Sequence, residues 1–282
     1  MKLIRSSSQM QTAALKLKRH GKTIALVPTM GALHRGHMEL IKRAKKLGKV
    51  TVVSIFVNPT QFGPREDFTK YPRTLNEDCR LCREAGVDFV FNPAADDVYP
   101  QDFDTYVVPE KIATVLEGAF RPGHFRGVAT VVLKLFNVVQ PDVAVFGKKD
   151  LQQSIVIKQM VRDLNIPVKI VIVPTVRDRD RLALSSRNVY LSELGRRRAR
   201  VIPEALFAAQ ELIRRGERSA AVIRNYITAR LVKDGEATVD YVSVADEKSL
   251  IELDRIAGNV AISLACRIDG VRLIDNVTMK VK

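Results

Sequence analysis

The chain has 282 residues, and 46 Lys and Arg against 31 Asp and Glu give it a formal net charge of +15. Hydrophobic residues make up 46% and charged residues 27%, which excludes a disordered or a fibrous protein. No apolar run approaches the roughly 20 residues that a membrane span needs. The first residues do not resemble a signal peptide, and three cysteines do not suit a secreted disulfide scaffold. We therefore expect a cytoplasmic protein of about two domains without a membrane partner, whose charge suggests an anionic ligand such as nucleic acid or a phosphorylated small molecule.

Strand-like and helix-like segments alternate through the first part of the chain. Apolar, β-branched runs predict strands, and apolar residues at helical spacing predict helices. The predicted helices span 10–19, 37–47, 75–85, 128–139 and 151–164, and the predicted strands span 23–27, 50–57, 88–91, 143–146 and 168–173. This alternation predicts an α/β fold, with a parallel sheet that binds ligands at the carboxyl ends of its strands.

The pattern changes after about residue 174. A long helix is predicted over 193–215, with Pro203 as a boundary or kink, and a second helix over 220–232. Short strands follow at 239–244, 260–266 and 272–274. We therefore predict a first domain over 1–175 and a smaller C-terminal α+β domain over 176–282.

The strongest chemical signal follows the first predicted strand, where His34-Arg35-Gly36-His37 opens a helix. Two histidines three residues apart lie on one face of a helix start, and the helix N-terminus adds unpaired N–H groups. Such a group suits a phosphate whose charge grows during a reaction. The alternative is a pair of surface or capping histidines. We favour the functional interpretation because only four histidines occur in the chain and two of them are here.

Six further motifs occur in order along the chain. They are Pro28-Thr29-Met30-Gly31, Val53 to Pro59 with Gln61-Phe62, Tyr71-Pro72-Arg73-Thr74, Arg121 to Gly127, Phe146 to Asp150 with Gln152-Gln153, and Leu184-Ser185-Ser186-Arg187-Asn188. Together they resemble the pantothenate synthetases (pantoate–β-alanine ligases), nucleotidyltransferases with a His-x-Gly-His signature. The resemblance covers nearly the whole chain and implies a Rossmann-like parallel sheet with helices on both faces.

The resemblance implies a reaction in two steps. Pantoate carboxylate attacks the α-phosphorus of ATP to give pantoyl adenylate and pyrophosphate, and the amine of β-alanine then displaces AMP to give pantothenate. ATP is expected to react with Mg²⁺ bound to its phosphates, and no dedicated protein metal site is expected. The family also implies a homodimer.

The resemblance assigns roles to particular residues. It places His34 and His37 at the phosphates, with a proton-donor role at His37, and gives a phosphate-binding role to Lys149. With those three as the catalytic residues, Gln61, Gln153 and Asn58 are expected to bind substrate, Gln61 also bordering β-alanine. The expected ATP-binding residues are Met30, Gly31, Ala32, Leu33, His34, Arg35, Gly36, His37, Gly147, Lys148, Lys149, Asp150, Val176, Leu184, Ser185, Ser186 and Arg187.

Some of these roles have alternatives. Asp150 could bond the ribose or cap the helix that follows it. The main chain of Val176 is expected to meet the adenine. The family usually has Asp-Gly-Leu-Ala before the Ser-Ser-Arg motif, whereas this chain has Arg181 in place of that Gly. Loss of the Gly makes a positive φ less accessible, so the loop could differ in shape or mobility.

Other features are given structural interpretations. Cys79 and Cys82 form a single Cys-x-x-Cys, without the second pair that a zinc site needs, and we predict buried or half-buried structural thiols. Neither a P-loop motif nor a dinucleotide-binding Gly-x-Gly-x-x-Gly after the first strand is present. The arginines at 196–198 and 200 are predicted to lie on a solvated helix face.

Two alternative functions stay open. Another nucleotidyltransferase, making a dinucleotide or a coenzyme A precursor, is disfavoured by the glutamine pair and the second domain. An RNA-binding protein is suggested by the net charge. However, residues 1–50 carry a balance of +11 and residues 176–200 a balance of +5, while the rest sums to −1. Because these two segments also hold the histidine and serine motifs, the charge fits a field around a triphosphate better than a nucleic-acid surface.

Overall fold

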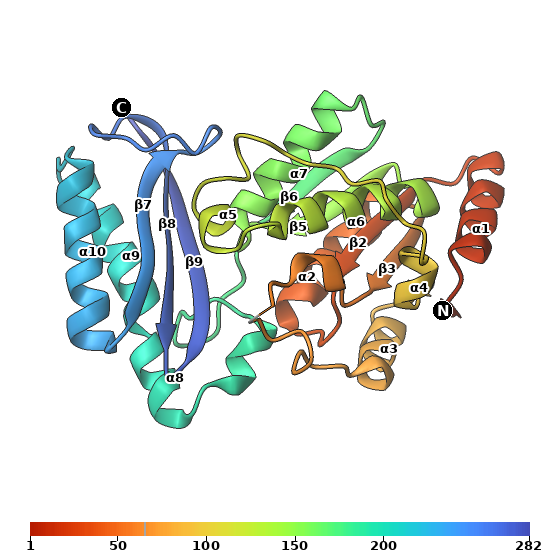
Figure 1. The fold of residues 1–282 in the computed structure, drawn as a ribbon, viewed down its shortest axis with the longest axis horizontal. Coiled ribbons are helices and arrows are strands. Elements are labelled where there is room, and N and C mark those ends of the chain that lie inside the picture. The colour runs from red at the N-terminus through yellow and green to blue at the C-terminus, as the bar shows by residue number, and fades with distance from the viewer. Residues whose placement is uncertain (65) are drawn as a thin grey trace. The chain divides into compact units, whose positions relative to one another are not determined.

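The computed structural model describes residues 1–64 and 66–282 and divides the chain into two compact units (Figure 1). The first unit comprises Met1–Thr114, Arg121–Lys148 and Gln153–Pro174. The second comprises Val115–Phe120, Lys149–Gln152 and Thr175–Lys282. Two short segments from earlier in the chain therefore cluster with the C-terminal residues.

The first unit is built on a six-stranded sheet whose adjacent strands all pair in parallel. Buried β-branched residues dominate its inner strands, as expected for a sheet covered on both faces. In spatial order the strands are β1 (Lys2–Ile4), β4 (Phe89–Phe91), β3 (Val50–Ile55), β2 (Ile24–Thr29), β5 (Val143–Gly147) and β6 (Lys169–Val173).

Helices cover both faces of this sheet. Alternate residues of β2 point to opposite faces, so that Ile24 and Leu26 join one core and Ala25 and Val27 join another. The first core receives side chains from α1 (Ser7–Arg19), α6 (His124–Val139) and α7 (Leu151–Asp163), and the second from α2 (Arg35–Leu47) and α3 (Leu75–Glu84).

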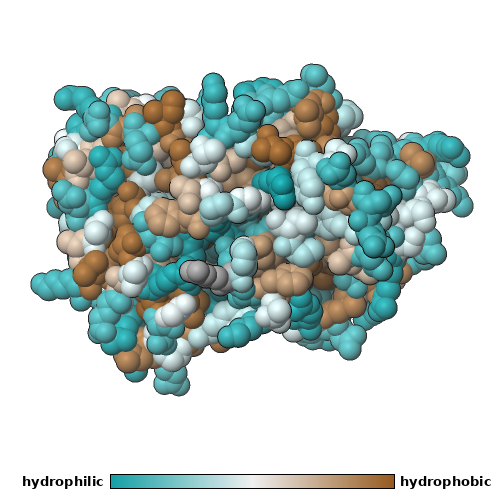
Figure 2. Space-filling model, in the orientation of Figure 1, coloured by the Kyte–Doolittle hydropathy of each residue, from teal (hydrophilic) through white to brown (hydrophobic). Residues whose placement is uncertain are grey.

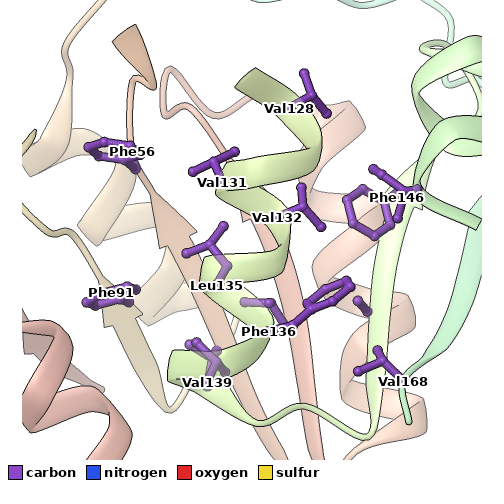
Figure 3. Close-up of a cluster of buried hydrophobic side chains, with 14 of the residues drawn as sticks. Phe56, Phe91, Val128, Val131, Val132, Leu135, Phe136, Val139, Phe146 and Val168 are labelled. Carbon is purple, nitrogen blue, oxygen red and sulfur yellow. The ribbon is translucent and has the colours of Figure 1, made fainter. Parts of the chain in front are cut away.

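Helix α6 supplies much of the first core. Figure 3 shows its apolar side chains, including Val132 and Phe136, on the side that faces the strand residues Phe91 and Phe146. Two short helices, α4 (Ala95–Val98) and the 3-10 helix η1 (Pro59–Gln61), complete the described elements of this unit. The predicted Rossmann-like sheet with helices on both faces is thereby confirmed.

The strand order reverses between β2 and β5, because β3 and β4 lie on one side of β2 while β5 and β6 lie on the other. Such a switch point in an open parallel sheet is where ligands bind, at the carboxyl ends of the strands. The loop after β2, which leads into the histidine motif, and the loop after β5, which holds the lysine motif, leave the sheet at this point.

The second unit contains the antiparallel sheet of β7 (Thr238–Asp246), β8 (Gly258–Ile268) and β9 (Val271–Val281), and this confirms the predicted smaller α+β fold. Helices α9 (Val201–Arg214) and α10 (Ala220–Gly235) pack on that sheet around a separate core. The unit also contains α5 (Glu117–Phe120), α8 (Glu193–Ala199) and the 3-10 helix η2 (Ser186–Tyr190).

The predicted helix over 193–215 is two helices, because α8 ends before Arg200 and α9 begins after it. Pro203 lies in the first turn of α9, where its missing N–H is not needed. Among the described residues, no helix combines the length and apolar character of a membrane span. On the face shown in Figure 2, hydrophilic residues alternate with small hydrophobic patches.

Candidate active site

The loop after β2 changes direction at Gly31 and Ala32, which both have positive φ. A Cβ on Gly31 would lie 3.0 Å from the Asp78 carboxylate and 3.1 Å from Ile55, so a side chain there would crowd two neighbours as well as strain the positive φ. Thr29 closes the turn, since its hydroxyl accepts from the Gly31 N–H at 3.1 Å and donates to the Ser54 carbonyl at 2.7 Å. The histidine motif thus follows a turn with a defined conformation.

His34 and His37 are both used by the first turn of α2. His34 is the N-cap, and its Nδ1 accepts from the Gly36 N–H at 3.1 Å. His37 Nδ1 accepts from the His34 N–H at 3.3 Å, which completes a capping box made of two imidazoles. The ring centroids lie 4.1 Å apart. A ring nitrogen that accepts a hydrogen bond carries no proton, so the proton of each neutral ring is on Nε2.

Capping and function are therefore compatible here. The sequence presented them as alternatives, but the cap uses Nδ1 and leaves Nε2 as the N–H donor of each ring. Two Nε2–H donors beside a helix N-terminus are suited to an anionic oxygen.

The carboxylate of Asp78, in α3, binds the main chain of the same loop. Its carboxylate is 1% exposed and accepts from the Leu33 N–H at 2.7 Å and the Ala32 N–H at 3.1 Å. Burial raises its pKa above the ordinary value, although these hydrogen bonds and one from Thr74 oppose the shift. A buried carboxylate thus sets the main-chain path immediately before His34.

A second polar cluster lies on η1, after β3. Gln61 is 8% exposed, and its Nε2 donates to the Met30 sulfur at 3.0 Å. Asn58 donates from Nδ2 to Gln61 Oε1 at 3.1 Å, while its own Oδ1 accepts from the Tyr99 hydroxyl at 2.9 Å. Gln61 is thereby brought next to Met30, whereas Asn58, 1% exposed, orients the Gln61 amide.

The Arg121–Gly127 motif supports this cluster. The Gln61 carbonyl accepts from Arg121 Nη2 at 3.3 Å and lies 2.8 Å from His124 Nδ1. Arg121 also makes two 2.7 Å hydrogen bonds to Glu66. Gly127 lies directly against the main chain of Thr60 and Gln61, where a Cβ would be only 2.6 Å from the Gln61 nitrogen. The motif therefore fixes the main chain that carries Gln61.

The lysine motif follows β5. The Lys148 N–H donates to the Val173 carbonyl at 2.8 Å and prolongs the pairing of β5 with β6. Lys149 is half-buried, and its Nζ lies 3.9 Å from Asp150 Oδ1. Gln153, in the first part of α7, is also half-buried.

The serine motif belongs to the second unit. The Leu184 N–H donates to the Val176 carbonyl at 3.0 Å, and Ser185 caps η2 by accepting from the Arg187 N–H at 3.3 Å. Arg181 takes the left-handed conformation that the family's Gly would favour, with φ +67°. Its guanidinium lies 5.2 Å from the centre of the Phe207 ring, so the loop keeps a Gly-like bend without a Gly.

Several basic residues near this loop are paired with acids. Arg196 donates to Asp178 at 2.7 Å and to Asp180 at 3.1 Å, and Arg198 donates to Glu236 at 2.6 Å. Both arginines are half-buried, whereas Arg197 and Arg200 are exposed, as expected for a solvated helix face. Their charge serves the structure of the second unit.

The cysteines have the structural character that was predicted. Cys82 is fully buried, which raises its pKa to about 12, and Cys79 is half-buried with a pKa also raised by burial. Within 1–64 and 66–282, no group of three or more His, Cys, Asp or Glu residues could hold a metal ion.

A family model described as pantoate-beta-alanine ligase matches residues 2–278 of the chain. The chain belongs to the pantoate–β-alanine ligase family. It is 50% identical to a pantothenate synthetase of Moorella thermoacetica, over 100% of this chain and 99% of that one. A pantothenate synthetase structure from Thermus thermophilus is 44% identical, with a TM-score of 0.93 over 98% of this chain and 99% of that one. A pantoate–β-alanine ligase structure from Francisella tularensis, complexed with β,γ ATP and β-alanine, is 37% identical, with a TM-score of 0.80 over 98% and 97%.

For this pantoate–β-alanine ligase family member, sequence reasoning missed the residues that hold the motifs in place. Asp78 lies inside a predicted helix and has no pattern that marks it. Arg121 and His124 were recognised as part of a motif, but no role was assigned to them. Their contacts are to residues far away in the sequence, and local spacing does not report such contacts.

Proposed function

We propose that this protein joins pantoate to β-alanine at the expense of ATP, through a pantoyl adenylate, with release of pyrophosphate and AMP. The observation that carries the proposal is the imidazole capping box at the carboxyl end of β2, beside the point where the strand order reverses. Family membership supplies the substrates, and the Francisella tularensis structure named for its ATP analogue and β-alanine supports both of them as ligands.

The side chains suit adenylation because this chemistry needs positioning and charge stabilisation more than a nucleophile on the protein. We propose that the Nε2–H groups of His34 and His37 donate hydrogen bonds to phosphate oxygens, and that the His37 N–H stabilises the charge that develops as pyrophosphate leaves. Lys149 supplies a positive charge to the same phosphates. Mg²⁺ is proposed to arrive as part of the MgATP substrate.

The remaining expected ligands keep their proposed roles. Gln61 and Gln153 bind the hydroxyl and carboxylate groups of pantoate, since an amide can donate and accept at once. Asn58 contributes to substrate binding mainly by orienting the Gln61 amide. Arg187 and the two serines before it contact the β- and γ-phosphates, and the main chain of Val176 meets the adenine. The other expected ATP-binding residues lie beside these, in the segments 30–37, 147–150 and 176–187.

Isotope exchange between pyrophosphate and ATP tests the reaction. We expect exchange that requires pantoate and does not require β-alanine, because the adenylate forms first. Exchange without pantoate, or release of ADP in place of AMP, would contradict the proposed chemistry.

Two substitutions test the proposed roles within the reaction. His37→Ala and Lys149→Ala should each slow adenylation by roughly 10²–10³-fold, the usual effect of removing one donor to a developing charge. The matched controls are His20→Ala and Lys158→Ala, which change exposed residues of α1's end and of α7 and should leave exchange unchanged. A near-normal rate in either active-site variant would remove that residue from the proposed mechanism.

We also propose a cytoplasmic homodimer, on the strength of the family resemblance alone. Sedimentation of the purified protein tests the oligomeric state, since a monomer at micromolar concentration would contradict it.

A further inference from the structure

We infer that Asn276, on the C-terminal strand β9, positions the proposed phosphate-binding Lys149 by holding its main chain. The inference rests on the proposed function for the role of the Lys149 side chain, but the tether itself is a property of the fold. The C-terminal sheet would then help to position the Lys149 charge, although Lys149 itself follows β5.

The chain changes unit within the lysine motif. Lys148 belongs to the first unit, where its N–H donates to the Val173 carbonyl, whereas Lys149–Gln152 belong to the second. Helix α7 therefore begins among residues of the second unit and continues in the first from Gln153. The hydrogen bonds that hold Lys149 and Gln152 are therefore sought among the residues of the second unit.

Asn276 makes the direct contact. Its side chain is 5% exposed, and Nδ2 donates to the Lys149 carbonyl at 2.8 Å. The Asn276 N–H donates to Asp275 Oδ1 at 2.7 Å, and the Asp275 carboxylate accepts from both terminal nitrogens of Arg177 at 2.6 and 2.9 Å. An amide fixed in this way is a rigid donor, because its own main chain is held by a buried ion pair.

A second tether holds the other end of the same segment. Gln152 is 5% exposed, accepts from the Glu117 N–H at 3.0 Å and donates to the Val115 carbonyl at 2.8 Å. The Glu117 carboxylate in turn accepts two hydrogen bonds from Arg272 of β9, at 2.7 and 2.9 Å, and one from Tyr241 at 3.0 Å. Strand β9 thus contacts Lys149 directly, through Asn276. It contacts Gln152 only indirectly, through the Glu117 that Arg272 holds.

The consequence for Lys149 follows from its flexible stem. A lysine ammonium has several rotatable bonds, so its position is defined only as well as its Cα is held. Fixing the Lys149 carbonyl on one side and Gln152 on the other restricts that Cα. The start of the Lys149 side chain is then placed before an anion binds, and only the side-chain torsions stay to be ordered on binding.

A double-mutant cycle tests the inference. Asn276→Ala removes the donor to the Lys149 carbonyl, and we expect pantoate-dependent pyrophosphate–ATP exchange to fall at least ten-fold. In a Lys149→Ala background the same substitution should change exchange less than two-fold, because Asn276 acts through Lys149. Equal losses in both backgrounds would overturn the positioning role.

Gln210→Ala is the matched control. Gln210 is also buried, and its amide also donates to a β9 carbonyl, that of Thr278, at 3.3 Å. It should show a similar change in melting temperature with little change in exchange. If Gln210→Ala slowed exchange as much as Asn276→Ala does, the effect would be one of general stability, and the inference would be wrong.

Amide hydrogen exchange separates this inference from the proposed function. In Asn276→Ala, but not in Gln210→Ala, peptides covering 149–153 should exchange faster, whatever reaction the protein catalyses. Unchanged protection of these amide hydrogens would overturn the tether even in an active enzyme. Faster amide hydrogen exchange in a protein that lacks pantoate-dependent activity would support the tether and refute the proposed function.

Discussion

Replacing Gly127 by alanine is the sharpest test of how the Gln61 turn is positioned. Gly127 lies in α6, and a Cβ built there would lie 2.5 Å from the carbonyl carbon of Thr60 and 2.6 Å from the nitrogen of Gln61, with the Thr60 oxygen also in contact. All three atoms belong to the main chain, so no side chain can rotate away. Relief requires the turn and the helix to separate.

The size of the shift follows from ordinary contact distances. Two such atoms normally approach to about 3.5 Å, so the main chain of Gln61 must move by about 1 Å. Overpacking of this kind typically costs about 1–3 kcal/mol of unfolding free energy. A misplacement of about 1 Å at a substrate-binding group can cost roughly 100-fold in rate, and we expect that loss in kcat/KM for pantoate.

Steady-state kinetics with pantoate varied at saturating ATP measure the effect, and urea denaturation measures the stability. Gly235→Ala is the control, because its Cβ would meet Val201 of the second unit at 2.6 Å, an overlap of similar size away from η1. The control should lose stability and keep its kcat/KM for pantoate. A Gly127→Ala enzyme with a near-normal value for pantoate would refute the reasoning.

Substitutions at three further positions test the supports described above. Asp78→Ala leaves the buried N–H of Leu33 and the part-buried N–H of Ala32 without their acceptor, and it should lower the free energy of unfolding by about 2–4 kcal/mol. Asp78→Asn keeps one acceptor oxygen and should lose less. Urea denaturation that ranks the two variants the other way would contradict this. Burial alone would raise the pKa of Glu66, but the hydrogen bond and charge of Arg121 outweigh it and hold the pKa below 4.5. The stability from Glu66 is therefore present above about pH 4.5 and lost as the pH falls below it. Below that pH the wild type should lose more melting temperature than Glu66→Gln, and equal losses would exclude this pair as the cause. Arg181 has a left-handed backbone conformation, and Arg181→Val should be about 1–2 kcal/mol less stable than Arg181→Gly in urea denaturation. Both variants lose the contact with Phe207, but only valine is strained at a positive φ. Equal stabilities would show that the bend relaxes.

The sheet was predictable from sequence because buried parallel strands are written as continuous apolar runs. The run at 50–57 contains β3, the run at 168–173 contains β6, and the run at 143–146 contains all of β5 but its last residue. Strand β1 was missed because it has only three residues, and only one of them, Ile4, is buried. Helix α6 begins earlier than predicted, since Gly123 and Gly127 obscure its first turn.

In the candidate site, too, only features with a local sequence signal could be predicted. His34 and His37 could be found because their spacing and position after a strand are local properties. The tautomer of each ring could not be found, since it depends on which main-chain N–H faces Nδ1. Asp78 and Asn276 were missed for a different reason, because a single hydrogen bond across the fold has no counterpart in spacing along the chain.

The imidazole capping box also makes the order of α2 depend on both rings at once. Replacing either ring by alanine would remove one of the two cap hydrogen bonds, to the N–H of Gly36 or of His34. The first turn of α2 would then loosen and the Nε2–H group of the remaining ring would be displaced as well. A loss of activity in either variant would in that case be accompanied by local fraying of a helix, which backbone NMR signals of residues 34–37 would record separately from the rate.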